Sequence, residues 1–249
     1  LLAPRLRRGD VAAAVIPVAL MGAVNATATM MACLPAFVLL IYRCAWKPLA
    51  GWLLGVALVS AWWIGPLLVL GRYSPPFTDF IESSYVTTRW LNLAEVLRGT
   101  TSWSPFVDTE RTAGHLLVAE PVFVLATLAV AAFGVAGLAL RSMPWRGYLA
   151  VLLCLGVGLL AAAHGPFGDA WLSLLDGPAA PFRNLHKLDP LVRLPLALGA
   201  GYALSRARTP VVVAGVLVTV LATSPAWTLR LAPEGTWTAV SSDWQDAAE

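Results

Sequence analysis

Long runs of apolar residues alternate with shorter polar segments along this 249-residue chain. A helix needs roughly 20 apolar residues to cross the hydrocarbon core of a bilayer. The apolar runs fall at 11–24, 26–42, 49–71, 117–140, 147–163, 190–204 and 210–223. The pattern therefore predicts an all-α integral membrane protein, a polytopic helix bundle with about six or seven spans.

Composition agrees with a membrane protein. Charged residues make up 12% of the chain, whereas an average soluble domain has roughly 25%, and the mean hydropathy is +0.72. The net charge of +3 is small and scattered, so it does not suggest binding to nucleic acid. The chain starts without an initiator Met or a signal sequence and ends as if a helix had just begun, so we expect an excerpt of a longer protein.

Basic and acidic residues separate by position. The short connections carry the pairs Arg43 and Lys47, Arg141 and Arg146, and Arg206 and Arg208. The long segments 72–116 and 164–189 are acidic. Because short cytoplasmic loops are enriched in Lys and Arg, we expect a multi-pass protein of the plasma (inner) membrane whose long loops and active face are extracytoplasmic. Residues 1–223 would form the transmembrane portion, and 224–249 would lead toward an extracytoplasmic domain outside this chain.

Residues 11–42 are too few for two full spans. Basic residues flank both ends, so the chain should cross outward and return, with each leg about 21–24 Å long against a hydrocarbon core of about 30 Å. Gly22 and Asn25 permit a break in the middle. Two interpretations stay open: a shallow hairpin whose turn is buried against protein, or an interfacial helix followed by one span.

The segment 72–84, RYSPPFTDFIESS, follows directly after a predicted span. Its two prolines end the span helix, and the residues after them predict a short helix on the membrane surface. Asp79 and Glu82 would share one face of that helix. They could serve as a general base or hold a divalent cation, or they could simply form a solvated face. The scattered cysteines and histidines show no metal-ligand spacing, so no other cofactor is assigned.

The segment 181–190, PFRNLHKLDP, carries a dense basic cluster before the next span. Its members are Arg183, His186 and Lys187. Arg193 lies inside the predicted span, where a charge tends to face protein and to be functional. Such side chains neutralise phosphates, either of a bound lipid or of bulk lipid, and Asp189 is a further candidate partner. A carboxylate and a basic cluster on one surface suit transfer of a group from a lipid phosphate.

Three segments carry a resemblance to a known family: 22–29 (GAVNATAT), 72–84, and 181–199 (PFRNLHKLDPLVRLPLALG). They resemble the membrane portion of the actinobacterial α-(1→3)-arabinofuranosyltransferases of the D type, which build branch points in mycobacterial cell-wall arabinan. The resemblance runs over most of the chain. It implies a GT-C fold, a decaprenyl-phosphate arabinofuranose donor, an arabinan acceptor, inversion at the anomeric carbon, and an active site on the periplasmic side. It also implies that a carboxylate of the first outer loop precedes this excerpt.

The resemblance assigns roles to residues of this chain. The carboxylates of the site would be Glu82 and Asp79. The candidates for the donor phosphate would be Arg183, His186, Lys187 and Arg193. The candidates for other substrate contacts would be Asn25, Tyr73 and Asn184.

Two other functions stay open. A transporter or lipid flippase would need ionisable pairs within several spans and a broken helix near the midplane, and the predicted spans are almost free of charge. A noncatalytic anchor for outer carbohydrate-binding domains would leave the basic cluster without a role. Convergence of Glu82 and that cluster on one outer surface would favour the transferase.

Overall fold

The computed structural model describes residues 1, 6–22, 25–74, 82–228, 231, 239 and 241–247. Every regular element among these residues is a helix, so the predicted all-α fold is confirmed. The longer helices are α3 (Ala26–Tyr42), α4 (Trp46–Tyr73), α9 (Pro121–Ala139), α10 (Arg146–Leu160), α12 (Pro190–Arg206) and α13 (Thr209–Trp227). Among the described residues, α4, α9 and α13 are long and apolar enough to cross a membrane, while α3 and α10 are shorter apolar helices. The count of six or seven spans stays a prediction.

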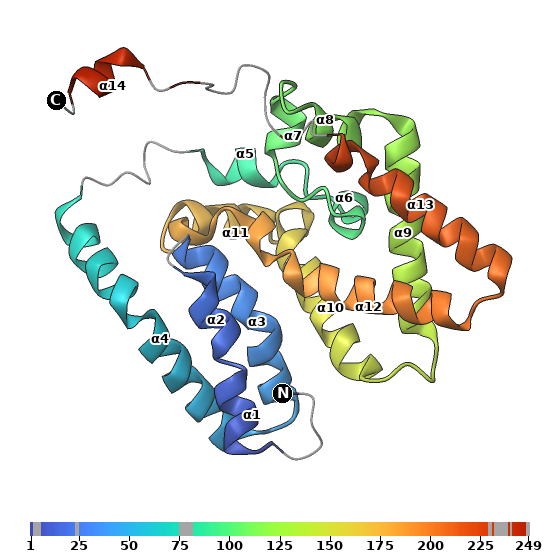
Figure 1. Ribbon diagram of the computed structural model, residues 1–249, viewed down its shortest axis with the longest axis horizontal. Helices are drawn as coiled ribbons and strands as arrows, with labels where there is room; N and C mark the ends of the chain where they lie inside the picture. The colour runs from blue at the N-terminus through green and yellow to red at the C-terminus, as the bar shows by residue number, and fades with distance from the viewer. Residues whose placement is uncertain are drawn as a thin grey trace.

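The region 11–42 folds as two short helices and one longer helix. The helices α1 (Arg8–Ala13) and α2 (Ile16–Met21) run toward one end of the molecule, and α3 returns beside them, as Figure 1 shows. Asn25 caps α3 by accepting a hydrogen bond from the backbone N–H of Ala28 at 2.9 Å. Thr27 donates to the carbonyl of Pro181 at 3.1 Å. Among the described residues, the path of α1, α2 and α3 is that of the hairpin interpretation, and the start of α3 contacts the Pro181 segment.

The remaining helices are short and most lie together at one end of the bundle, which we call the loop end and define by residues 82–119 and 161–189. They are α5 (Ser84–Thr88), α6 (Leu93–Arg98), α7 (Ser104–Val107), α8 (Thr112–Ala119), η2 (Ala162–His164), α11 (Gly168–Asp176), η3 (Ala180–Phe182), η4 (Leu185–Leu188) and, apart from them, α14 (Ser242–Asp246). The opposite end carries the basic connections around 43–47 and 140–146, and we call it the basic end (Figure 1).

The helices α9 and α12 approach each other closely because both carry glycine at the crossing. A Cβ added at Gly137 would lie 1.8 Å from the carbonyl oxygen of Gly199, and one added at Gly134 would lie 2.7 Å from that of Leu196. Small residues allow such backbone contact between membrane helices. This contact sets the position of α12, whose first residues lead into the loop end.

A hydrophobic core lies under the loop end and supports its short helices. Leu152 and Leu160 of α10, Leu191 and Val192 of α12, and Leu185 of η4 are almost completely buried there. A buried ion pair adds to this support, since the guanidinium of Arg98 contacts Glu95 at 2.7 Å and donates to Thr127 of α9 at 3.0 Å. The polar segments 82–119 and 161–189 therefore pack on a hydrophobic core.

Candidate functional site

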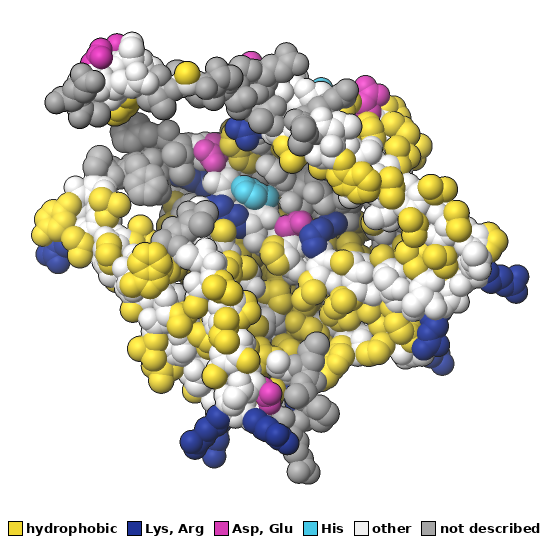
Figure 2. All heavy atoms as spheres, in the orientation of Figure 1, with side chains coloured by type: hydrophobic (Ala, Val, Ile, Leu, Met, Phe, Trp, Pro, Cys, Tyr) yellow, Lys and Arg dark blue, Asp and Glu magenta, His cyan; other side chains and the backbone are white. Residues whose placement is uncertain are grey.

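The predicted site residues lie mainly on two segments of the loop end that pack together, one beginning at Glu82 and one spanning Asp176–Arg193. Figure 2 shows a histidine with acidic and basic side chains around it in a recess on this face, above helices that are mostly apolar. Asp79 lies outside the described residues, and so does most of the short helix predicted after the two prolines of the segment 72–84. Glu82 itself is not helical, because α5 begins two residues later at Ser84.

Glu82 is held beside the basic cluster by Asn184. The side-chain N–H of Asn184 donates to Oε1 of Glu82 at 2.9 Å, and Oδ1 of Asn184 accepts from the indole N–H of Trp103 at 3.4 Å. Partial burial raises the pKa of Glu82, but the Asn184 hydrogen bond and the charges of Arg183 and His186 outweigh it, so the pKa lies below its ordinary value. Glu82 is therefore ionised at neutral pH.

At His186 the environment favours the neutral form of the imidazole. Burial disfavours its charged form, and the ammonium of Lys187 adds repulsion, so the pKa of His186 is lowered despite the attraction of Glu82. The ring is neutral at pH 7 and can offer one N–H donor. Within the described part of the chain, no hydrogen bond or ion pair engages the ammonium of Lys187, which is half-buried.

Arg183 is tied into a network behind this surface. Its side chain is only 7% exposed and lies 3.6 Å from Oδ1 of Asp176. The same carboxylate accepts from the backbone N–H of Ser84 at 2.8 Å and from its hydroxyl at 2.6 Å. The carbonyl of Arg183 accepts from the Thr87 hydroxyl at 2.8 Å. The network fastens α5, and therefore Glu82, to the basic segment.

Sequence reasoning missed Asp176 and Ser84. A signal was present, because Asp176 is the last residue of α11, where a carboxylate is unfavourable to the helix dipole and needs a compensating partner. Burial raises the pKa of Asp176, but the Ser84 hydrogen bonds and the charge of Arg183 lower it more, so the group stays ionised.

Arg193 faces protein, as expected for a charge inside a helix. Its guanidinium pairs with Asp189 at 3.1 Å and donates to the carbonyls of Leu97, at 2.8 Å, and Val96. These carbonyls belong to the last turn of α6, where backbone acceptors lack helical partners. Its donors are thus directed at α6 and Asp189, and the residue locks α6 to the start of α12.

Asp189 also holds α6 and the start of α12 together. Its other carboxylate oxygen accepts from the hydroxyl of Thr101 at 3.2 Å. Burial raises the pKa of Asp189 above its ordinary value, although the charge of Arg193 and the bond from Thr101 oppose the rise. The turn that carries His186 and Lys187 is therefore fixed on both sides.

Two of the predicted substrate contacts stand outside this cluster. The Asn25 amide caps α3 near the Pro181 turn. Tyr73, at the end of α4, is 80% exposed and makes no hydrogen bond or ring contact among the described residues. No group of three metal-ligating side chains occurs in the described part, and the predicted divalent cation stays untested because Asp79 lies outside it.

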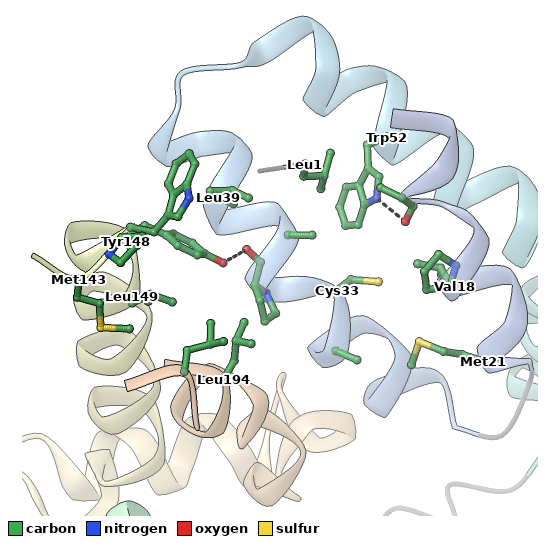
Figure 3. A pocket seen from close by; sticks show the side chains of 18 of the residues that line it. Leu1, Val18, Met21, Cys33, Leu39, Trp52, Met143, Tyr148, Leu149 and Leu194 are labelled. Carbon is green, nitrogen blue, oxygen red and sulfur yellow. Dashed lines mark hydrogen bonds between the residues drawn. The ribbon is translucent and has the colours of Figure 1, made fainter. Parts of the chain in front are cut away.

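The molecule also has an apolar cavity of about 640 Å³ away from these residues. It lies between the N-terminal helices and α10 and α12, and Figure 3 shows Cys33, Tyr148 and Leu194 among its walls. Tyr148 donates to the carbonyl of Pro35 at 2.7 Å, and the indole of Trp52 donates to that of Ala14 at 3.4 Å. None of the candidate polar residues lines this cavity, so it is distinct from the candidate site.

The fold and the site define a class: an all-α membrane protein with an ionised carboxylate and cationic groups gathered at one end of the bundle. Comparison with known proteins gives the family. The profile described as "Alpha-(1->3)-arabinofuranosyltransferase, N-terminal GT-C domain" matches residues 3–249. The chain therefore belongs to the family of α-(1→3)-arabinofuranosyltransferases and corresponds to the N-terminal GT-C domain, which confirms the resemblance.

Two curated relatives and one solved structure are similar over nearly the whole chain. The α-(1→3)-arabinofuranosyltransferase of Mycolicibacterium smegmatis (strain ATCC 700084 / mc(2)155) is 48% identical over 93% of this chain and 18% of its own length. The one of Mycobacterium tuberculosis (strain ATCC 25618 / H37Rv) is 45% identical over 97% of this chain and 20% of its own length. The cryo-EM structure of arabinofuranosyltransferase AftD from mycobacteria superposes with a TM-score of 0.69 and 38% identity, over 97% of this chain and 16% of that one. The chain thus spans about a fifth of its curated relatives.

Proposed function

We propose that the protein to which this chain belongs is a polyprenyl-phosphate-dependent arabinofuranosyltransferase. It transfers arabinofuranose from a decaprenyl-phosphate donor to a cell-wall arabinan acceptor, with inversion, on the extracytoplasmic side of the plasma membrane. The observation that carries the proposal is the ionised carboxylate of Glu82, held 2.9 Å from the amide of Asn184 in the segment that also presents His186 and Lys187. Membership of the arabinofuranosyltransferase family supports it.

The chemistry needs one base and one cation. An acceptor hydroxyl attacks the anomeric carbon, the bond from that carbon to the donor phosphate oxygen breaks, and the electron pair leaves with the polyprenyl phosphate. Glu82 accepts the hydroxyl proton. A carboxylate of lowered pKa is a weak base, and it suits a late proton transfer, because the hydroxyl becomes acidic only once its oxygen is bonding to carbon.

The departing phosphate would be met by Lys187 and by the N–H of neutral His186. A free ammonium is a compact point charge for a phosphate, and preorganised donors stabilise developing negative charge. Arg183 and Arg193 would support the site indirectly and would not contact the phosphate, because the first is buried against Asp176 and the second is bound to α6. Both hold the turn that presents Lys187 and His186.

An apolar pocket under the same turn offers a place for the hydrocarbon of the donor. It measures about 280 Å³ and is lined by Met30 and Leu34 of α3, Trp171 and Leu175 of α11, and Phe182. Phe182 directly precedes the basic segment, so a lipid phosphate at Lys187 and its first isoprene units in this pocket would be neighbours. With the active face extracytoplasmic, as we propose, the donor head group would lie at the level of this turn.

The alternatives receive less support. A transporter would carry paired charges inside its spans, whereas α9 and α13 contain no charged residue at all. A noncatalytic anchor gives no reason for Glu82 to meet the basic segment.

The test is Glu82→Gln in the full-length protein, assayed with a synthetic decaprenyl-phosphate arabinofuranose and an arabinan oligosaccharide. Loss of a general base typically slows a reaction by about 10²–10⁴-fold, and we expect a fall of kcat in this range. Glu110→Gln is the matched control, because Glu110 is exposed in the same outer segment and should leave kcat unchanged. Normal transfer by Glu82→Gln would remove Glu82 from the mechanism.

A further inference from the structure

A further cavity opens at the basic end, far along the bundle from the candidate site. It lies between α1 and the first half of α4 and has a volume of about 830 Å³, within the roughly 300–1,000 Å³ of ligand pockets. Its mouth carries three basic side chains, Arg7, Arg8 and Lys47, all of them exposed. Figure 2 shows basic side chains projecting from this end of the molecule.

The floor of the groove is apolar and narrows along α4. Gly51, Leu58 and Val59 lie on it, opposite Val11 and Val15 of the N-terminal helices. Gly55 brings the two elements into contact, since a Cβ there would lie 2.6 Å from the Val15 side chain. At Gly51 such a Cβ would lie in ordinary van der Waals contact, 3.8 Å from Val11, so the two elements are less tightly packed there than at Gly55.

The three basic side chains at the mouth, Arg7, Arg8 and Lys47, have no ion-pair partner in the described part of the chain. The nearby carboxylate of Asp10 accepts a hydrogen bond from the backbone N–H of Arg7 at 2.8 Å. Among the described residues, the mouth therefore has three positive charges, on Arg7, Arg8 and Lys47, and one negative charge, on Asp10.

We propose that this groove is a binding site for an anionic phospholipid of the leaflet at the basic end. The phosphate lies between Arg8 and Lys47, where an Arg fork and a Lys point charge can share it, and one acyl chain descends over Gly51 along α4. Basic pockets between helices near a membrane surface are suited to anionic head groups. The apolar floor distinguishes this ligand from a soluble anion or an acidic protein, which would leave the floor uncovered. Neither the family nor the proposed transfer reaction assigns this site.

The test uses the full-length protein purified in detergent and mixed with dioleoyl phosphatidylglycerol or dioleoyl phosphatidylcholine. Retained lipid is counted by native mass spectrometry. Each Lys or Arg near an anionic surface contributes enough to change binding about fivefold, so Arg8→Gln/Lys47→Gln should weaken retention of phosphatidylglycerol by about 25-fold. Retention of phosphatidylcholine, weaker from the start, should change little.

The matched control is Arg141→Gln/Arg208→Gln, which removes two exposed charges from other basic connections outside the groove. It should leave phosphatidylglycerol retention unchanged. Gly51→Leu keeps every charge and fills the groove, and it should weaken retention as well. The thermal midpoint of each variant in detergent shows whether it is folded. If the two double variants weaken retention equally, the effect is surface potential and no site exists.

A second measurement identifies the occupant. Phosphatidylglycerol with a diazirine on one acyl chain is photolysed in the presence of the full-length protein, and the adducts are mapped by peptide mass spectrometry. We expect adducts within 51–59 that excess unlabelled phosphatidylglycerol removes. Adducts only elsewhere would mean that another segment of the protein, or a second copy, covers the groove, and would overturn the proposal.

Discussion

The contact between Asn184 and Glu82 allows a sharp test of the electrostatics of the candidate site. Asn184→Asp replaces the N–H donor, 2.9 Å from Oε1 of Glu82, by a carboxylate oxygen of the same shape. The new side chain can still accept from Trp103 and remains beside the basic residues. Two carboxylates at this distance cannot both ionise easily, and the pKa of one of such a pair rises.

The magnitude follows from two contributions. A hydrogen bond to a charged group contributes about 1.5–3 kcal/mol, which corresponds to about 1–2 pKa units at 1.36 kcal/mol per unit. Glu82 is only half-buried, so solvent should reduce the loss of this bond to about 1 unit. Repulsion from the added carboxylate should contribute about 1 unit more, and the pKa of Glu82 would rise by about 2 units.

The assay is the pH dependence of kcat/KM with the donor and acceptor described above. In the wild type the Glu82 pKa is lowered, so activity that needs the ionised carboxylate persists to acid pH and is lost only as the pH falls through that low pKa. The acid limb of the profile should move up by about 2 pH units in Asn184→Asp and by about 1 in Asn184→Ala. Asn92→Asp is the control, because Asn92 caps α6 and Asp caps as well as Asn. An acid limb that stays in place in Asn184→Asp would refute the assignment.

Two further predictions concern the supports of the site. Because the pKa of Asp176 is lowered, the wild type should have a higher thermal midpoint than Asp176→Asn at pH 7. This difference should shrink as the pH falls through the Asp176 pKa. A constant difference from pH 7 to 3 would contradict a stabilising role of the Asp176 charge. Gly137→Ala in α9 should destabilise the fold by about 1–3 kcal/mol or more, because the added Cβ collides with the Gly199 backbone of α12. Gly201→Ala in α12 is the control and should not destabilise, because no atom lies within 4 Å of the added Cβ. Equal thermal midpoints of the two variants in detergent would contradict this reasoning.

The sequence by itself determined the class of fold and the placement of the longer helices. Apolar runs of near-bilayer length can only satisfy their backbone groups as helices, so the runs at 49–71, 117–140 and 210–223 correspond to α4, α9 and α13. The segments 22–29, 72–84 and 181–199 were also sufficient to indicate the family, which the family model over residues 3–249 confirms.

The tertiary structure alone decided which charges are available for chemistry. The sequence makes Arg183, His186, Lys187 and Arg193 all candidates for the donor phosphate. In the structure, however, Arg183 is buried against Asp176 and Arg193 is bound to the end of α6. Arg193 donates to Leu97, and Asp176, the partner of Arg183, is itself held by Ser84. Leu97 and Ser84 both lie far away along the chain, and no local pattern encodes such distant pairings. Whether a basic side chain can bind a substrate depends on whether its donors are already bound to protein groups. Long-range packing determines those partners.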